Sequence, residues 1–290
     1  MRQKPAACAG GFWDDPPLRT GQSGRGVGGT METITSRTNA LITRIRKLTA
    51  DRKFRRKEGV MVCEGPKMLA EALAWGAAIE TVLWQEGAQG DPSLVPSVRQ
   101  VAVPADLLRS VAPTQTPQQV LFLCALPAHT LPESLSGTRY LVLDGLQDPG
   151  NVGTLWRTAD AFGADGLILL PGCADPWNPK TLRATMGACF RLPVWEGTLE
   201  ALLPLLDQAS LPLYATALRE DTEDIRDLSL DRAAVAIGSE GRGVSAAVLA
   251  ASAKTLKIPM TPRCESLNAA AAGAVVLWQM GFGRPSGRQD

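Results

Sequence analysis

The sequence is poor in the residues that build metal and disulfide sites: it has one histidine and six cysteines in 290 residues. The cysteines stand at positions 8, 63, 124, 173, 189 and 264, and no two of them form a C-x-x-C pair. Because zinc sites use grouped thiolate and imidazole ligands, we predict no metal site. We expect reduced thiols, mostly small buried apolar side chains, in a cytoplasmic protein.

The sequence also lacks a long apolar run and an excess of either charge. Every apolar stretch is broken before the ~18 residues that a membrane span requires, so we predict no membrane segment. Residues 1–30 are rich in Gly, Pro, Arg and Ser without the apolar core of a secretory signal. We expect a disordered extension there, with Met31 as a candidate start. Thirty basic residues oppose 29 acidic ones, so attraction to nucleic acid must come from local patches.

What is present is enough apolar sequence for folded domains. Hydrophobic residues make up 45% of the chain and charged residues 20%, which is typical of a globular protein. A chain of 290 residues is long enough for two domains. Strand and helix patterns predict a compact α/β domain over residues 31–128. Proline and glycine without periodicity indicate a linker over residues 125–138, and a second domain is expected over residues 137–284.

A basic amphipathic helix is predicted over residues 38–57, because Leu41, Ile42, Ile45 and Leu48 recur at helical spacing. Its basic residues are Arg44, Arg46, Lys47, Arg52, Lys53, Arg55, Arg56 and Lys57. Composition alone leaves two interpretations open. The cations form either a solvated helix end or a surface that contacts RNA phosphates.

The second half of the chain alternates strand and helix patterns. Strands are expected at residues 140–143, 167–170, 213–216, 233–237 and 255–258, with helical stretches between them. Continuous apolar strands separated by helices predict a parallel sheet covered on both faces. In such sheets ligands bind at the loops that leave the carboxyl ends of the strands.

The first such loop contains Asp148, Pro149 and Gly150, and Asn151 follows at the predicted N-cap of a helix. Arg157 lies six residues further along that helix. It is either a solvated or salt-bridged helix residue, or a functional residue near the pocket.

The second loop runs from Gly238 to Gly243 and includes Glu240. Its glycines indicate close backbone approach or positive φ angles, either in a structural turn or at a ligand. It has neither the ending of a P-loop nor the spacing of a dinucleotide fingerprint, which disfavours an NTPase or a Rossmann oxidoreductase.

The third loop follows the strand that ends at Ile258, and it leads into a helix capped by Ser266 or Asn268. The alanines 269–272 indicate tight packing against a neighbouring element, which would also suit a dimer.

Together these loops resemble the three motifs of the SpoU/TrmH family of RNA ribose 2'-O-methyltransferases. The resemblance covers residues 139–283, and residues 37–125 resemble the ribosomal-protein-like substrate-binding domain often found ahead of them. It implies a parallel-sheet α/β methyltransferase domain whose C-terminal part forms a trefoil knot. It also implies a homodimer that builds the active site at its interface.

The resemblance further implies methyl transfer from S-adenosylmethionine to RNA, with ribosomal RNA favoured over transfer RNA. The implied site residues are Asn151, Arg157, Glu240, Ser266 and Asn268. The implied donor-binding residues are Thr216, Ala217, Gly238, Ile258, Met260 and Leu267. Two alternatives remain, a non-catalytic RNA-binding or ribosome-assembly factor and a knotted methyltransferase that modifies a base nitrogen.

Overall fold

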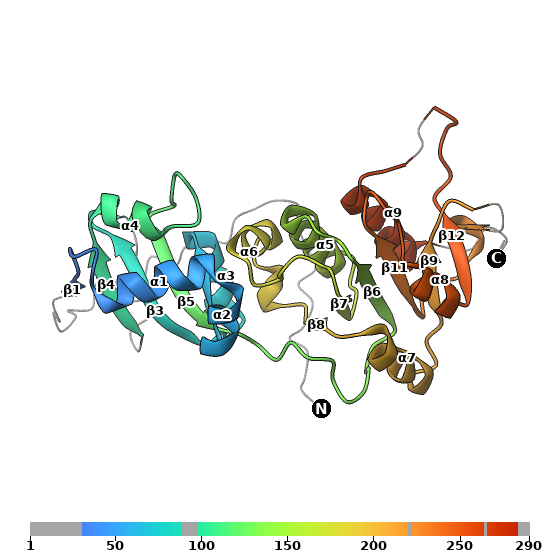
Figure 1. The fold of residues 1–290 in the computed structure, drawn as a ribbon, viewed down its shortest axis with the longest axis horizontal. Helices are drawn as coiled ribbons and strands as arrows, with labels where there is room; N and C mark the ends of the chain where they lie inside the picture. Colours follow the sequence, from blue (N-terminus) through green and yellow to red (C-terminus); the bar gives the residue numbers. More distant parts are fainter. Residues whose placement is uncertain (1–30, 89–97, 220–221, 264–265, 284–290) are drawn as a thin grey trace, which may run out of the picture. The chain divides into compact units, whose positions relative to one another are not determined.

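The computed structural model describes residues 31–88, 98–219, 222–263 and 266–283. The disordered extension expected over residues 1–30 lies outside the described residues. The chain after Thr30 clusters into one compact unit. Within this unit the chain builds two sheets in succession (Figure 1).

The first sheet is mixed and belongs to the N-terminal part. Its five strands lie in the order β1 (Glu32–Thr33), β4 (Arg99–Val103), β3 (Ile79–Gln85), β5 (Val120–Ala125) and β2 (Val60–Glu64). β1, β4 and β3 pair in parallel, whereas β5 pairs antiparallel with β3 and β2. The helices of this part are α1 (Ala40–Ala50), α2 (Arg52–Glu58), α3 (Pro66–Ala74) and α4 (Ala105–Val111).

The second sheet has seven strands, and every neighbouring pair is parallel. The order is β10 (Glu223–Asp224), β12 (Lys254–Lys257), β9 (Leu213–Thr216), β11 (Ala233–Gly238), β6 (Arg139–Asp144), β7 (Gly166–Leu169) and β8 (Val194–Glu196). All six residues of β11 are buried, as expected for a strand covered on both faces. The predicted parallel sheet is therefore confirmed.

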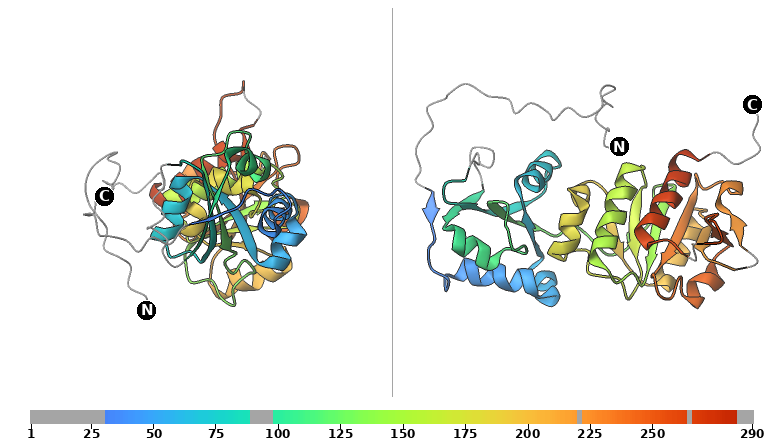
Figure 2. Two further views of the ribbon diagram at one scale, coloured as in Figure 1. Left: turned by 90° about the vertical axis from the view of Figure 1, so that its left-hand side faces the viewer. Right: turned by 90° about the horizontal axis from the view of Figure 1, so that it is seen from above.

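Helices cover both faces of this sheet. Leu141 and Leu143 pack in one buried cluster with side chains of α5 (Pro149–Ala161) and α9 (Ala269–Phe282). Tyr140 and Val142 pack in another with side chains of α7 (Leu199–Gln208) and α8 (Ala246–Ala251). The alternation follows from the two-residue period of a strand. Figure 2 shows α5 and α9 on the same face of the sheet.

The prediction of one helix over residues 38–57 is wrong, because the chain breaks at Asp51 between α1 and α2. Asp51 has an extended backbone, and its Oδ1 accepts hydrogen bonds from the N–H groups of Lys53 (2.8 Å) and Phe54 (3.2 Å). Asp51 is therefore the N-cap of α2. The basic residues after Asp51 do not continue the polar face of α1.

Three short strands were not predicted: β1, β8 and β10. Each has only two or three residues and lies at the edge of its sheet. Strands of this length are too short for a two-residue period to be recognised. None of the described helices is long and apolar enough to cross a bilayer.

Helix α6 (Pro179–Thr185) packs closely against α5 because Gly153 has no side chain. A Cβ at Gly153 would lie 2.4 Å from the carbonyl oxygen of Thr181 and 2.6 Å from the Cβ of Ala184. Helix α6 also contacts β2 of the first sheet. It therefore connects the N-terminal part to the helix that follows the first loop.

The described cysteines are free thiols. Cys63, Cys124 and Cys189 are buried, and Cys173 is half-buried. Burial raises the pKa of Cys124 and Cys189 to about 12 and that of Cys173 to about 11, so these groups are uncharged at neutral pH. Their burial agrees with the prediction that most of the cysteines are small apolar core residues.

Candidate active site

Loops that leave the carboxyl ends of β9, β11 and β12 surround a cavity of about 280 Å³. The lining includes the six residues predicted to bind the methyl donor, Thr216, Ala217, Gly238, Ile258, Met260 and Leu267. Glu240 and Ser266 line the same cavity. Because the three strands are parallel neighbours, their loops meet at one edge of the sheet.

The cavity is lined by apolar side chains and by the backbone at the ends of the strands. Leu218 is 63% exposed and Leu267 is 36% exposed, and both line the cavity. Large apolar side chains left open to solvent indicate a binding surface. An apolar wall beside backbone polar groups suits an adenine ring. The residues present therefore fit the adenosine part of S-adenosylmethionine.

The second loop is a tight turn in which glycine is required. Ser239 and Gly243 exchange backbone hydrogen bonds of 3.2 and 2.8 Å, and Gly243 has a φ of +66°. A Cβ at Gly238 would lie 2.0 Å from the carbonyl carbon of Gly243. The glycines thus have a structural role in the turn, and the backbone of this turn also forms part of the cavity wall.

Asp148, rather than Asn151, caps α5. The Oδ1 atom of Asp148 accepts a hydrogen bond from the backbone N–H of Asn151 at 2.8 Å. This bond, more than the nearby Lys180, lowers the pKa of Asp148 below its usual value. The predicted N-cap was therefore wrong by three residues, and the side chain of Asn151 is not used for capping.

Hydrogen bonds join the three loops through their predicted polar residues. The Nδ2 group of Asn151 donates to Oε1 of Glu240. The Nδ2 group of Asn268 donates to Oδ1 of Asn151 at 3.4 Å. Asn268 also caps α9, since its Oδ1 accepts from the backbone N–H groups of Ala270 and Ala271. Of the two predicted caps, Asn268 rather than Ser266 caps the helix.

Arg157 stands apart from these residues. It is exposed on α5 and does not line the cavity. Six residues at roughly 100° each place it about 120° around the helix axis from Asn151. Among the described residues, no hydrogen bond or ion pair holds its guanidinium group. The structure therefore does not bring Arg157 together with Asn151, Glu240 and Asn268 within one chain.

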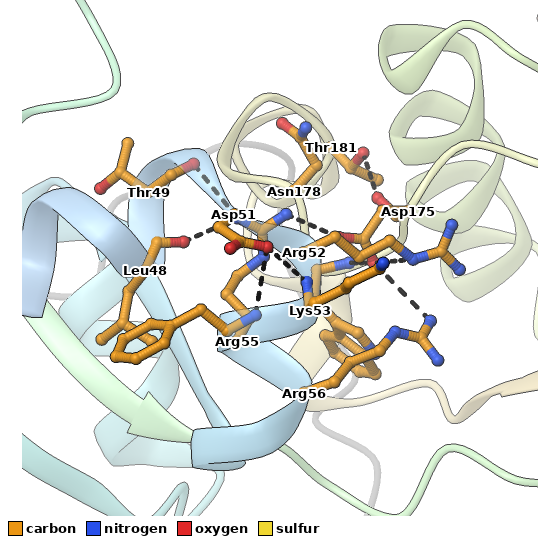
Figure 3. A network of polar contacts seen from close by, with 12 residues as sticks. Leu48, Thr49, Asp51, Arg52, Lys53, Arg55, Arg56, Asp175, Asn178 and Thr181 are labelled. Carbon is orange, nitrogen blue, oxygen red and sulfur yellow. Dashed lines mark hydrogen bonds and ion pairs between the residues drawn. The ribbon is translucent and has the colours of Figure 1, made fainter.

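The predicted RNA-contacting segment has a different role at Arg55 (Figure 3). Its guanidinium group donates to the carbonyl oxygens of Leu48 (2.6 Å) and Thr49 (3.1 Å) and to Oδ2 of Asp175 (2.7 Å). The side chains of Arg55 and Asp175 are only 2% and 8% exposed. Because Arg55 does not face solvent, its prediction as an RNA contact is wrong.

Arg52 and Arg56 flank this buried pair. Arg52 forms an ion pair of 2.9 Å with Glu196, and Arg56 pairs with the same carboxylate. Both also lie within 4 Å of Asp175, at 3.8 and 3.9 Å. Their guanidinium groups connect α2 to β8 and to the loop before α6. Because acidic side chains already hold both arginines, neither is the free cation that the predicted phosphate contact assumed.

The other basic residues of the segment differ in their partners. Arg44 pairs with Glu80 and Glu58, and the hydrogen bond to Glu80 is the main cause of its raised pKa. The Nζ atom of Lys47 lies 5.8 Å from the ring centre of Phe54. Three exposed cations have no side-chain partner within the described ranges. They are Arg46, Lys53 and Lys57.

The comparisons with known proteins agree with this arrangement. The SpoU rRNA Methylase family matches residues 138–278, and the MRM3-like substrate binding domain matches residues 39–121. The chain is 32% identical to the 23S rRNA (guanosine(2553)-2'-O)-methyltransferase RlmP of Bacillus subtilis, over 86% of this chain and 99% of the relative. The chain belongs to the SpoU rRNA methylase family.

Two further rRNA methyltransferases match along most of the chain. A 23S rRNA (uridine(2479)-2'-O)-methyltransferase of Streptomyces viridochromogenes is 30% identical over 88% of this chain and 93% of its own length. The AdoMet-bound rRNA methyltransferase from Sinorhizobium meliloti has a TM-score of 0.77 and 28% identity, and covers 87% of this chain and 98% of that one. A substrate-binding domain followed by a parallel-sheet methyltransferase domain is thus confirmed.

Sequence analysis missed the roles of four residues, which are Asp148, Asp144 and Leu218 at the strand-end loops and Asp175 at the contact with α2. Asp148 was signalled by Pro149, which favours the first helical position and places the cap directly before it. Asp144 ends β6, and its Oδ2 accepts the backbone N–H of Ser245 at 2.6 Å, which joins the first and second loops. Leu218 and Asp175 have no recognisable signal, because their roles depend on segments distant in sequence.

Replacing Asp175 with Asn should destabilise the fold by about 3–5 kcal/mol, because Arg55 would remain as an uncompensated buried charge. The matched variant Glu196→Gln should cost about 1 kcal/mol or less, since its arginine partners are 47% and 33% exposed and screened by water. Urea unfolding measures both free energies. Equal losses in the two variants would contradict the role given to the buried pair.

Proposed function

We propose that this protein uses S-adenosylmethionine to methylate a ribose 2'-hydroxyl in ribosomal RNA. The observation that carries the proposal is the hydrogen-bonded connection of Asn151, Glu240 and Asn268 beside the cavity. The relatives from Bacillus subtilis and Streptomyces viridochromogenes are named as 23S rRNA 2'-O-methyltransferases. Their names support both the ribose target and ribosomal rather than transfer RNA.

The proposed reaction depends mainly on positioning. S-adenosylmethionine supplies a methyl group on a sulfonium, and the ribose oxygen bonds to that carbon as the carbon–sulfur bond breaks. The apolar walls and strand-end backbone around Gly238 and Leu267 hold the adenosine part. The amide and carboxylate groups of Asn151, Glu240 and Asn268 hold the loops and the ribose by hydrogen bonds. Holding the reacting atoms in line supplies much of the acceleration.

Arg157 has a separate role in this proposal. A guanidinium group is effectively always protonated, so it is a poor base. We assign it to the RNA phosphate next to the target, where its charge lowers the pKa of the ribose hydroxyl. Phosphate or water then accepts the proton.

Wild-type protein should transfer labelled methyl groups to unmodified 23S rRNA transcribed in vitro, and Asn151→Ala should reduce the rate by about 100-fold because the reacting groups lose their alignment. Thr154→Ala, an exposed change on the next turn of α5, is the matched control and should keep full activity. Nuclease digestion and mass spectrometry identify the product. Label on a base nitrogen would contradict the ribose target, and no transfer with intact RNA binding would favour a non-catalytic factor.

The proposal divides the chain into a ribosomal-protein-like RNA-binding domain over residues 31–128 and a methyltransferase domain over residues 137–284. It includes a trefoil knot in the second domain and a cytoplasmic location. For the RNA-contacting surface we propose Arg46, Lys53 and Lys57. Their support is that all three are exposed and unpaired among the described residues.

The triple replacement of Arg46, Lys53 and Lys57 by Ala should weaken rRNA binding while donor binding stays unchanged. The slope of log affinity against log salt concentration should become shallower by about two to three, because fewer counterions are released. The control removes the same charge elsewhere, at Arg37, Arg99 and Arg226, which pair with acidic residues. Filter binding over a range of salt concentrations measures both variants. Equal losses of affinity would indicate a net-charge effect and contradict this surface.

A homodimer is also part of the proposal, and an apolar stripe on α9 supports it. Val275, Trp278 and Phe282 are 40%, 55% and 60% exposed. Phe162, the C-cap residue of α5, contacts both aromatic rings, with centroids 5.7 and 6.1 Å away. Exposed apolar patches of this kind are typical of protein interfaces. We propose that a second copy covers this stripe and contributes its Arg157 to the site.

Mixing equal amounts of inactive Asn151→Ala and Arg157→Ala subunits should restore about a quarter of the wild-type activity. Half of the dimers then contain one subunit of each variant. In such a dimer one of the two sites combines the intact Asn151 of one subunit with the intact Arg157 of the other. Adding Trp278→Asp to both variants should prevent this recovery by disrupting the stripe. Methyl transfer after subunit exchange is the measurement. No recovery despite confirmed mixed dimers would show that both residues act within one chain.

A further inference from the structure

A second cavity lies away from the donor site, where the substrate-binding domain meets α6. It has a volume of about 210 Å³, and its walls include Glu64, Met68 and Thr114 of the N-terminal part and Lys180 and Arg183 of α6. A smaller cavity of about 120 Å³ adjoins it and shares Glu64, Met68 and Arg183. The larger cavity is below the roughly 300–1,000 Å³ of pockets that enclose a drug-sized ligand. Its size suits a single planar group.

Glu64 is the unusual residue of this cavity. Its side chain lines both cavities, and the residue is only 9% exposed. Oε1 accepts hydrogen bonds from the hydroxyl of Thr114 (2.7 Å) and the backbone N–H of Gln118 (3.2 Å). Oε2 is buried and has no partner. A buried carboxylate oxygen without a donor is unfavourable, so this atom is available to accept a hydrogen bond from a ligand.

Cations surround the same cavities without neutralising Glu64. Lys67, Lys180 and Arg183 are exposed residues of the walls, and no ion pair joins Glu64 to any described residue. The site thus combines a buried acceptor, apolar walls and exposed positive charge. A nucleotide has the matching features, because its base carries N–H donors and flat apolar faces and its phosphate is an anion.

Lys180 connects this cavity to the first loop, which lies between β6 and α5. Its Nζ atom lies 3.5 Å from Oδ2 of Asp148. Asp148 caps α5 by accepting the backbone N–H of Asn151, and the side-chain Nδ2 group of Asn151 donates to Glu240. Three polar contacts in series therefore join the wall of this cavity to Glu240 in the wall of the donor cavity.

We propose that this cavity binds the base of an RNA nucleotide that flanks the methylated one, and that Glu64 accepts a hydrogen bond from its exocyclic amino group. This inference rests on the proposed function for the identity of the RNA. Cytosine, adenine and guanine carry such an amino group. Uracil has carbonyl oxygens on both sides of its only ring N–H, and these oxygens repel the carboxylate. The site therefore selects against uracil at the flanking position.

Binding of short single-stranded oligo(C) and oligo(U) tests this inference, since the two bases are nearly equal in size and differ at the amino group. Wild-type protein should bind oligo(C) about tenfold more tightly, the effect of one charge-assisted hydrogen bond. Glu64→Gln keeps an acceptor for Thr114 but places an amide N–H₂ at the free position. It should abolish the preference, because this group donates to the uracil carbonyl.

Glu86→Gln is the matched control, because it makes the same acid-to-amide change at an exposed residue that lines neither cavity; the preference should persist. Equal binding of the two oligonucleotides by the wild type, or an unchanged preference in Glu64→Gln, would overturn the inference. The readout is binding, so it is independent of catalysis. A preference that depends on Glu64 in a protein without methyl transfer would support the base site while contradicting the proposed function.

Discussion

The parallel pairing of β11 with both β6 and β9 determines where the site of this protein lies. Parallel strands end at the same edge of a sheet, so the loops after β6, β9, β11 and β12 are brought together although they are far apart in sequence. Asp144 reinforces this arrangement by accepting the backbone N–H of Ser245. The connection of Asn151, Glu240 and Asn268 is a consequence of that common edge.

The second constraint is electrostatic and acts between the first sheet and the methyltransferase domain. Arg55 is buried with Asp175, and two further arginines share Glu196. Such a buried pair is expensive to desolvate and is weak evidence for stability by itself. Its geometry is specific, however, because Arg55 also binds the last carbonyls of α1. The pair therefore fixes α2 beside the loop that leads into α6 and the second cavity.

The alternation of apolar strands with helical stretches predicted the parallel sheet, because it is a strong local signal. The residues of the donor cavity were instead implied by the resemblance of three loops to the SpoU/TrmH motifs. Sequence analysis failed where a side chain is used by a distant segment. The cations of residues 44–57 looked alike in sequence, yet Arg55 is buried and Lys53 is exposed. The break at Asp51 was missed although aspartate is a common N-cap. The unpartnered oxygen of Glu64 depends on burial and has no sequence signal.

The central claim is that the cavity between the strand-end loops binds the methyl donor. Calorimetric titration with S-adenosylmethionine tests it directly in the wild type, in Leu267→Lys and in the control Trp75→Lys, which adds the same charge at the exposed C-cap residue of α3. We predict wild-type affinity for the control and a loss of at least about tenfold for Leu267→Lys, which removes apolar contact and adds a charge that repels the sulfonium. Equal affinity of Leu267→Lys and the wild type would place the donor elsewhere.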